Sequence, residues 1–565
     1  MNRLTHFILR YQRYVVAFWI VVTVVGIALV SNITGALSKD FRQPGQEGFE
    51  TNQAILRQYG VAGNREPVVP VLTLPAGTTV DSPGIKQQIA SAFAPVQQFY
   101  PKALVASYGS TGSRSFVSAD GRTTFALIIQ PGSQSGFGHG DAAPLERQIV
   151  AGHTIAGAAW HVTGVDALAG DTGGGGGPGV LSEALLGGLG ALIVLAFVFG
   201  SLLAVIPLLM ALPAIMGTFL LIGGLNHFTS ITFIVEYLVA LIGLGVAIDY
   251  SLLVVMRWRE ERARGLENTA AVQRAMESAG TAVIHSGTTV AIGLAALAVL
   301  PVPFMRGLGF GGMLIPLVSV LVAVTLLPVI LNTIGPRIDW PRRKRTSDAG
   351  RGWAAWATLV VRRRWVAAGV AAAVLLALLG AAVTLNVHNP LASDYGGSGE
   401  AQSTLGTLNA TGIGPGPLSP IVILSPQARA NDLAEALAHT AGIRGAVAPS
   451  SWQSGDSAIV AAFTSADPNS GAGRATLARI TPIAHTYGAR AGGSVALSED
   501  FISTVYGNFT LMVALIALST FLLLARAFRS ILLPLKAVVL NILSVGAAWG
   551  LMVLVWQHGW GSNLI

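Results

Sequence analysis

The chain has 565 residues, a mean hydropathy of +0.61 and a formal net charge of +8, and only 11% of its residues are charged. Soluble domains contain about 25% charged residues, so this composition excludes a purely soluble protein and predicts an integral membrane protein with soluble modules. Cysteine is absent, which excludes disulfides, thiolate chemistry and cysteine-based metal sites.

The first element is an apolar run that follows Arg3, Arg10 and Arg13 and predicts a transmembrane span within residues 1–30. A signal peptide has the same outline, but a similar basic-then-apolar segment recurs at 362–383, which favours an uncleaved span. Residues 31–179 are polar and are expected to form an external α+β domain. Its glycine run, 173–177, is expected to be a flexible linker.

Within this first domain, hydrophobic periodicity predicts the order strand, helix, strand, strand, helix, strand, which is a split βαβ pattern. The predicted segments are 68–74, 84–99, 104–108, 123–129, 144–158 and 160–165.

A bundle of five spans is expected at 180–335, followed by a basic linker at 336–364 and a seventh span at 365–383. The five apolar runs are 181–198, 202–223, 231–255, 282–300 and 309–330. The arginines lie in the loops on one side of these spans. We therefore expect a cytoplasmic N-terminus, an external first domain and a cytoplasmic basic linker. Arg257, Arg259 and Arg262 are interpreted as orientation signals and lipid-headgroup anchors.

The second half repeats this plan, which predicts a parallel repeat. A second external domain is expected at 384–506, with spans eight and nine within 507–565. Its strands are predicted at 421–424, near Ala446, at 458–463 and at 494–497, with helices at 430–440 and 473–484. Phe199-Gly200-Ser201 matches Phe528-Arg529-Ser530 at an offset of 329. Because the second half has three of six expected spans, we expect the chain to be C-terminally truncated.

The predicted span at 231–255 carries an acidic residue, Asp249, followed by Tyr250. A carboxylate within hydrocarbon costs about 2.5–3.5 kcal/mol, so such residues are rare and usually functional. Asp249 could take up a proton on one side of the membrane and release it on the other, with Tyr250 as a hydrogen-bond donor. The alternative is a hydrogen bond between helices that only holds packing.

Other polar and small residues near this pair are supporting candidates, each with a plain alternative. Ser286 and Thr289 lie on one face of the next span, where they could support the relay or bond back to their own helix. Glu236 could line a proton entrance or be an interfacial carboxylate in external water. Gly243 and Gly245 are expected to permit close helix packing. The histidines show no metal-ligand spacing, and the scattered Ser, His and Asp residues show no catalytic triad.

Two stretches carry a resemblance to a known family. GLGVAIDYSLLVVMRWREE (243–261) resembles the fourth-span signature of MMPL-type transporters of the resistance–nodulation–division (RND) superfamily. PVPFMRGLGFGGMLIPLVSVLVAVTLLPVILNTIG (301–335) resembles their fifth-to-sixth-span segment, and the block 181–335 resembles a sterol-sensing-domain-like bundle. The fold class implied is a polytopic α-helical membrane protein with an RND-like pseudo-repeat and two split-βαβ porter-like external domains.

The resemblance also implies a function: proton-driven export of a lipid or other hydrophobic solute across the bacterial plasma (inner) membrane. It assigns Asp249 and Tyr250 to the proton relay, although the family's matching Asp-Tyr pair of the tenth span is absent from this sequence. The expected partners are the hydrophobic or lipid substrate, protons, membrane lipids, and a second copy or a cell-envelope protein. No enzymatic activity, cofactor, metal or nucleic acid is expected. The alternatives are a non-transporting lipid or sterol sensor and a SecDF-like protein-export partner.

Overall fold

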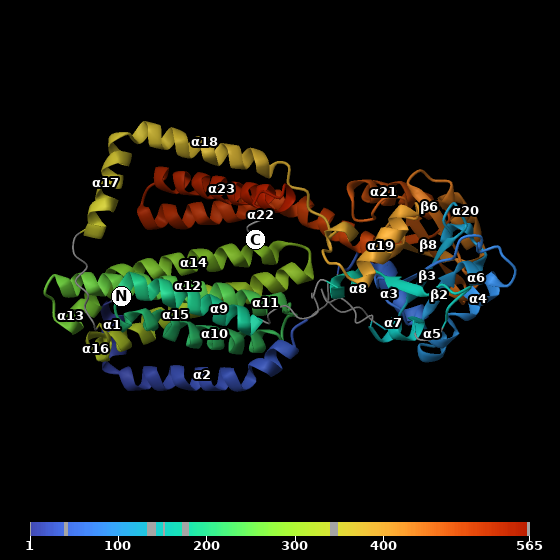
Figure 1. Cartoon of the computed structure of the whole chain (residues 1–565). Coiled ribbons are helices and arrows are strands. Elements are labelled where there is room, and N and C mark those ends of the chain that lie inside the picture. The colour runs from blue at the N-terminus through green and yellow to red at the C-terminus, as the bar shows by residue number, and fades with distance from the viewer. Residues whose placement is uncertain are drawn as a thin grey trace. The chain divides into compact units, whose positions relative to one another are not determined.

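The computed structural model describes residues 2–38, 43–132, 143–150, 153–171, 180–339 and 348–561. The chain divides into two compact units (Figure 1). We call Met1–Ser38, Pro178–Val387 and Asn508–Ile565 the membrane unit, and Lys39–Gly177 with His388–Gly507 the α/β unit. The glycine run 173–177, predicted to be a linker, lies outside the described residues.

Apolar helices build the membrane unit, as predicted. Among the described residues, eight helical stretches are long and apolar enough to cross a membrane, and a shorter apolar helix covers Ser182–Phe197. The eight are Gln12–Gly35, Leu202–Leu225, Ile234–Ala263, Asn268–Val299, Pro303–Thr333, Arg364–Ala382, Gly493–Phe528 and Leu532–Gln557. The prediction of a polytopic helical membrane protein is confirmed.

Helix α15 (Pro303–Thr333) is the centre of the first bundle and is apolar on all sides, as a helix surrounded by other helices must be. It contacts α10 (Val205–Leu225), α12 (Gly243–Ala263) and α14 (Thr281–Ala295). Its glycines allow close approach: a Cβ at Gly307 would lie 2.6 Å from the Ser230 carbonyl oxygen.

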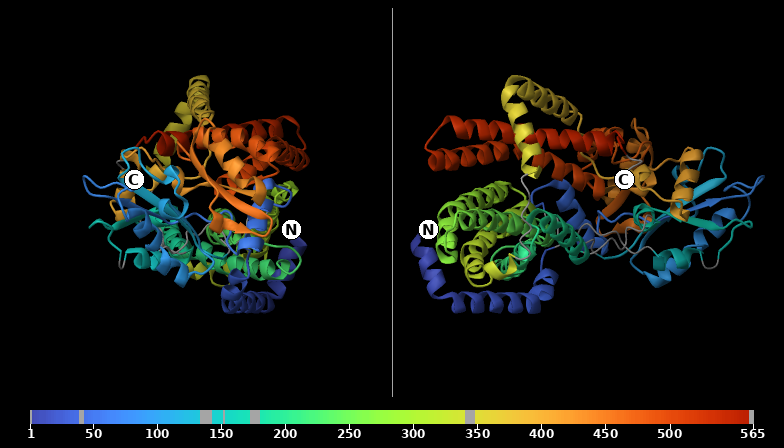
Figure 2. Two further views of the ribbon diagram at one scale, coloured as in Figure 1. Left: turned by 90° about the vertical axis from the view of Figure 1, so that its right-hand side faces the viewer. Right: turned by 60° about the vertical axis from the view of Figure 1, so that its left-hand side comes forward.

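Two other helices, α18 (Arg364–Ala382) and α23 (Leu532–Met552), pack side by side, as can be followed in Figure 1 and in the right-hand view of Figure 2. A Cβ at Gly550 of α23 would overlap the Leu378 carbonyl oxygen, so these two backbones are in direct contact. Glycine at this position therefore sets the distance between the two helices.

The α/β unit contains two antiparallel sheets with the same topology. The first has the order β2-β3-β1-β4, built from Leu104–Ser107, Thr123–Ile129, Val69–Thr73 and Trp160–Thr163. The second has the order β6-β8-β5-β9, built from Ile443–Val447, Ser457–Thr464, Ile421–Pro426 and Arg490–Gly492, with a short β7 (Gln453–Ser454) beside β8. When the four main strands of each half are numbered in chain order, both sheets have the order second, third, first, fourth. This shared order confirms the predicted split βαβ repeat.

The two sheets exchange their leading helices. Helix α3 (Glu47–Tyr59), which precedes the first sheet in sequence, packs on β9 and β5 of the second. Helix α19 (Glu400–Ala410), which precedes the second sheet, packs on β4 and α8 (Val165–Asp171) of the first. The two sheets therefore form one interlocked body.

An aromatic cluster fills the space between the sheets. The rings of Phe116, Phe125 and Phe463 lie with centroids 5.1–5.6 Å apart, and all three are fully buried. The Trp452 Nε1 donates a hydrogen bond to the Val105 carbonyl oxygen at 3.1 Å. Apolar burial thus holds the two sheets together directly.

The structure corrects two predicted segments. The helix expected at 84–99 is two helices, α4 (Ile85–Ser91) and α5 (Ala94–Phe99), because Pro95 has no N–H to bond the Ser91 carbonyl oxygen and its ring clashes with that carbonyl, so it fits only the first turn of a new helix. The strand expected at 494–497 is wrong, because β9 ends at Gly492 and the chain turns at Gly493 (φ +90°) into helix α22 (Gly493–Phe528). Val495 and Ala496, adjacent in sequence, are both buried, which a one-sided strand would not permit.

Candidate functional site

The pair Asp249–Tyr250 lies on α12, and its two side chains point in different directions. Tyr250 is buried, with 8% of its surface exposed. Asp249 is exposed and shares its helix face with Ile242, Leu253 and Met256, which are also exposed. Neighbouring residues on an α-helix are about 100° apart, so the two side chains cannot face the same helix.

Tyr250 points at α14, where its hydroxyl is within hydrogen-bonding reach of Ser286. Gly287 lies at this contact and leaves no room for a side chain. A Cβ at that position would lie 3.3 Å from the Tyr250 hydroxyl and would overlap the Cγ2 methyl of Val320. Thus α12, α14 and α15 meet at a glycine without free space. No sequence signal other than the glycine itself indicated this position.

The supporting candidates are distributed around this contact. Thr289 Oγ1 donates to the His285 carbonyl oxygen at 2.8 Å. This is the bond back to its own helix that was given above as the alternative to a role in the relay. Ser286 is exposed apart from its approach to Tyr250. Glu236 is half-buried in the short helix α11 (Ile234–Tyr237), at the start of the same span.

The two glycines of α12 differ in their surroundings. Gly243 is buried, and a Cβ there would lie 3.5 Å from Ile215 Cγ1 and 3.6 Å from Ile315 Cγ2, which are ordinary contact distances. Gly245 is exposed, and a Cβ there would meet no atom within 4 Å. Gly243 therefore lies at a helix contact, whereas Gly245 faces no neighbour among the described residues.

Both helices of the contact contain a π-helical turn that the sequence did not reveal. The turn η3 (Leu238–Ile242) separates α11 from α12, and η4 (Met276–Gly280) precedes α14. A π turn holds one residue more than an α turn and often lies near a functional site. The predicted span 231–255 is therefore one apolar helix with an extra residue upstream of Asp249.

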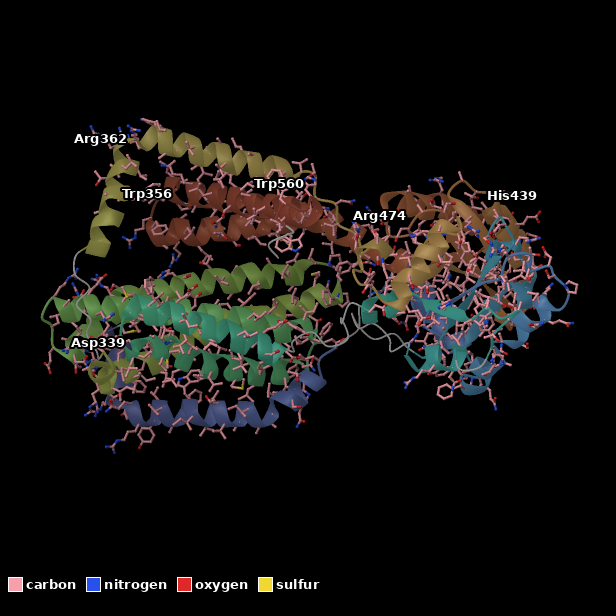
Figure 3. All side chains as sticks on the ribbon, in the orientation of Figure 1. Asp339, Trp356, Arg362, His439, Arg474 and Trp560 are labelled. Carbon is pink, nitrogen blue, oxygen red and sulfur yellow. The ribbon has the colours of Figure 1, made fainter. Side chains whose placement is uncertain are left out.

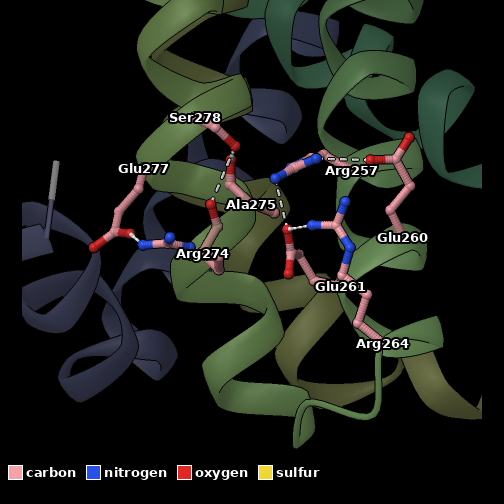
Figure 4. Close-up of polar contacts among 8 residues, drawn as sticks. All are labelled: Arg257, Glu260, Glu261, Arg264, Arg274, Ala275, Glu277 and Ser278. Atoms are coloured by element: carbon pink, nitrogen blue, oxygen red, sulfur yellow. Dashed lines mark hydrogen bonds and ion pairs between the residues drawn. The ribbon is translucent and has the colours of Figure 1, made fainter.

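At the other end of α12, arginines form ion pairs within the protein. Glu261, 3% exposed, forms ion pairs with Arg257 and Arg264 at 2.7 Å each, as Figure 4 shows. Arg259 pairs with Asp339 at 2.9 Å, and Figure 3 labels Asp339 at the end of α16 (Gly335–Ile338). Of the arginines interpreted as headgroup anchors, Arg257 thus pairs within its own helix, whereas Arg259 joins α12 to the end of α16.

A second polar cluster lies in the α/β unit around Glu66, just before β1. Its carboxyl interacts with the Ser419 and Ser494 side chains, which belong to the second sheet's half of the chain. Burial raises the pKa of Glu66 to about 8, and the neighbouring Asp166 and Asp467 act in the same direction. Burial likewise raises the pKa of Asp467. Glu66 is therefore mostly protonated at neutral pH and can donate a hydrogen bond.

Comparison with known proteins identifies relatives over most of the chain. The sequence model of the MMPL family matches residues 79–384 and 431–564. The chain is 32% identical to the mycolic acid-containing lipids exporter MmpL11 of Mycolicibacterium smegmatis, over 66% of this chain and 42% of that protein. It is 29% identical to a putative membrane protein of Streptomyces coelicolor, over 96% of this chain and 76% of that protein. It is 26% identical to the trehalose monomycolate exporter MmpL3 of M. smegmatis, over 66% of this chain and 42% of that protein. The chain therefore spans less than half the length of these mycobacterial relatives.

Proposed function

Because the chain belongs to the MMPL family, we propose that it acts in the export of lipids or other hydrophobic compounds, driven by the proton-motive force. Two mycobacterial relatives are named as exporters of mycolic acid-containing lipids and of trehalose monomycolate, which supports a lipid as the substrate class. The proposed setting is the bacterial plasma membrane, with the N-terminus in the cytoplasm and the α/β unit outside.

One observation carries the proton coupling: Asp249 is a carboxylate in the apolar part of the helical stretch Ile234–Ala263, which is long and apolar enough to cross a membrane. In hydrocarbon an ionised Asp249 costs about 2.5–3.5 kcal/mol, and this cost disappears when the carboxyl takes up a proton or meets a polar partner. Each proton that crosses 100 mV supplies about 2.3 kcal/mol. We assign proton uptake to Asp249 and a hydrogen-bonding role to Tyr250 and Ser286, with Thr289 and Glu236 as secondary members.

The proposed path of the substrate runs between the two sheets of the α/β unit. The cluster of Phe116, Phe125 and Phe463 closes this space, so passage of a solute requires the sheets to separate. A bulky apolar solute could replace the ring contacts that separation breaks.

The test is Asp249→Asn in the full-length protein, reconstituted in vesicles with an imposed pH gradient. The variant should insert and fold normally but lose substrate export and coupled proton flux. The matched control is Glu260→Gln, on the same helix but exposed and ion-paired with Arg257 outside the apolar part, which should transport like the parent. Proton-coupled export by Asp249→Asn would refute the assignment.

The same vesicles separate a lipid sensor from this proposal, and a gene deletion separates a SecDF-like export partner from it. A lipid or sterol sensor would bind its ligand without any pH-driven flux. A SecDF-like export partner would, when deleted, impair the secretion of many proteins and leave no single lipid retained in the cell.

A further inference from the structure

The π turn Leu238–Ile242 places an extra residue just before α12, about two helical turns upstream of Asp249. In the π turn Leu238–Ile242, each carbonyl is bonded to an N–H five residues ahead instead of four. If the π turn with its extra residue moves to a point after Asp249 in the chain, each residue between the old and the new π turn takes the place of the residue that follows it. This is a rotation of roughly 100° about the helix axis.

Such a step has a defined consequence for the acidic pair. Asp249 would leave the exposed face of α12 and enter the place that Tyr250 now occupies, beside Ser286 on α14. Resting on the proton coupling proposed above, we propose that the turn Leu238–Ile242 permits this one-residue register shift and thereby moves Asp249 between an exposed face and the α14 contact.

The surroundings of the two glycines of α12 accept a Cβ, whereas those of Gly287 in α14 do not. In the shift, Leu244 takes the place of Gly245, where a Cβ meets no atom within 4 Å. Ile242 takes the place of Gly243, where a Cβ makes only ordinary contacts. The same shift in α14, which has its own π turn, would put Ser286 at the place of Gly287, where any Cβ overlaps Val320.

A place for the π turn to form again lies around Ser251, just after Asp249 and Tyr250 in the chain. The Ser251 hydroxyl donates to the carbonyl oxygens of Ala247 at 2.8 Å and Ile248 at 2.9 Å. When a π turn forms there, these carbonyls lose their α-helical partners, and a serine hydroxyl can occupy freed carbonyls in an apolar environment. Ser251 is completely buried, so water cannot take this role.

The register can be read by cysteine crosslinking, because the chain has no cysteine. Gly243→Cys with Ile315→Cys reports the present register, since a Cβ at Gly243 lies 3.6 Å from Ile315 Cγ2. Ile242→Cys with Ile315→Cys reports the shifted register and leaves Asp249 and Tyr250 intact. A protease site inserted at Gly265, in the loop after α12, separates the two halves so that a disulfide is visible on a non-reducing gel.

In vesicles oxidised with copper phenanthroline, the first pair should crosslink without a gradient. The second pair should crosslink several-fold more when a pH gradient is imposed. A second pair that never responds to the gradient, in vesicles where the parent protein exports, would overturn the register shift. Proton-coupled export by Asp249→Asn would instead overturn the proposed function, so the two failures are distinguishable.

A deletion provides an independent test. Removing Leu241, whose side chain is 42% exposed, eliminates the extra residue and leaves the rest of α12 in its present register. This variant should keep the Gly243→Cys–Ile315→Cys crosslink and lose export, whereas Leu241→Ala should export like the parent. Export by the deletion variant at the parent's rate would also overturn the proposal.

Discussion

Gly287→Ala is the sharpest test of the packing around Tyr250. The added Cβ would overlap the Val320 Cγ2 methyl and lie 3.4 Å from the Pro316 carbonyl oxygen. Valine is β-branched and stiff, so the strain passes to the backbones of α14 and α15. Overpacking of this kind costs about 1–3 kcal/mol, and replacing a helical glycine by alanine returns up to about 1 kcal/mol. We expect a net loss of about 1–2 kcal/mol in the free energy of unfolding.

The assay is equilibrium unfolding of the purified protein in mixed micelles as the SDS fraction rises. The matched control is Gly293→Ala on the same helix, where a Cβ meets no atom within 4 Å, and this change should be neutral or slightly stabilising. Val320→Ala removes the methyl that the new Cβ would strike. The double variant should therefore be more stable than the sum of the single effects predicts, by about 1 kcal/mol or more. If Gly287→Ala is as stable as Gly293→Ala, or gains nothing from Val320→Ala, the described contact is wrong.

Two further predictions concern the α/β unit. The folded-state pKa of Glu66, about 8, lies above the ordinary value of 4.5, so its effect on stability is greatest below pH 4.5 and is lost as the pH rises to 8. Glu66→Gln should remove this dependence and slow hydrogen exchange in β1 at pH 8 by at least about tenfold relative to the parent protein, whereas an unchanged pH profile would contradict the raised pKa. Asn52→Ala should lower stability by about 1–3 kcal/mol, because the buried Asn52 side chain accepts from the Gly493 N–H at 2.8 Å and donates to its carbonyl at 3.2 Å. Thermal unfolding measures this loss of stability, and the control is Arg57→Ala, an exposed position on the same helix. Equal losses in the two variants would refute the stabilising role of the Asn52 hydrogen bonds.

Local patterns in the sequence were sufficient to predict most of the strands and apolar helices and their order, but not helices α3 and α19, which exchange between the two sheets. The strand β3 was predicted at its observed bounds, because a run of apolar and β-branched residues is bounded by turn residues on either side. The apolar helices followed from the length and composition of the apolar runs. The strand predicted at 494–497 failed because a short apolar run fits a strand or a buried helix equally well, and the long-range packing against α3 decided between them.

The parts that position the candidate site were less predictable. Asp249 and Tyr250 were identified because a charged residue in an apolar span is conspicuous, but periodicity alone did not show which of the two faces the bundle. A π turn adds a single residue and changes no composition, so η3 left no signal. Glu66 is an ordinary exposed-type residue in sequence, and its surroundings depend on Ser419 and Ser494, more than 350 residues away.

The arrangement of the acidic pair limits the mechanisms that remain. Asp249 and Tyr250 are neighbours in sequence, so a rigid α12 gives them two different partners at all times. A rigid relay therefore requires a polar group outside the first bundle to meet Asp249, because the face it shares with Leu253 and Met256 is otherwise apolar. A rotating α12 requires no second group, since the carboxyl and the hydroxyl then use the same contact with Ser286 in turn. The two mechanisms predict opposite results for deletion of Leu241, because the first depends only on the present register and the second depends on leaving it.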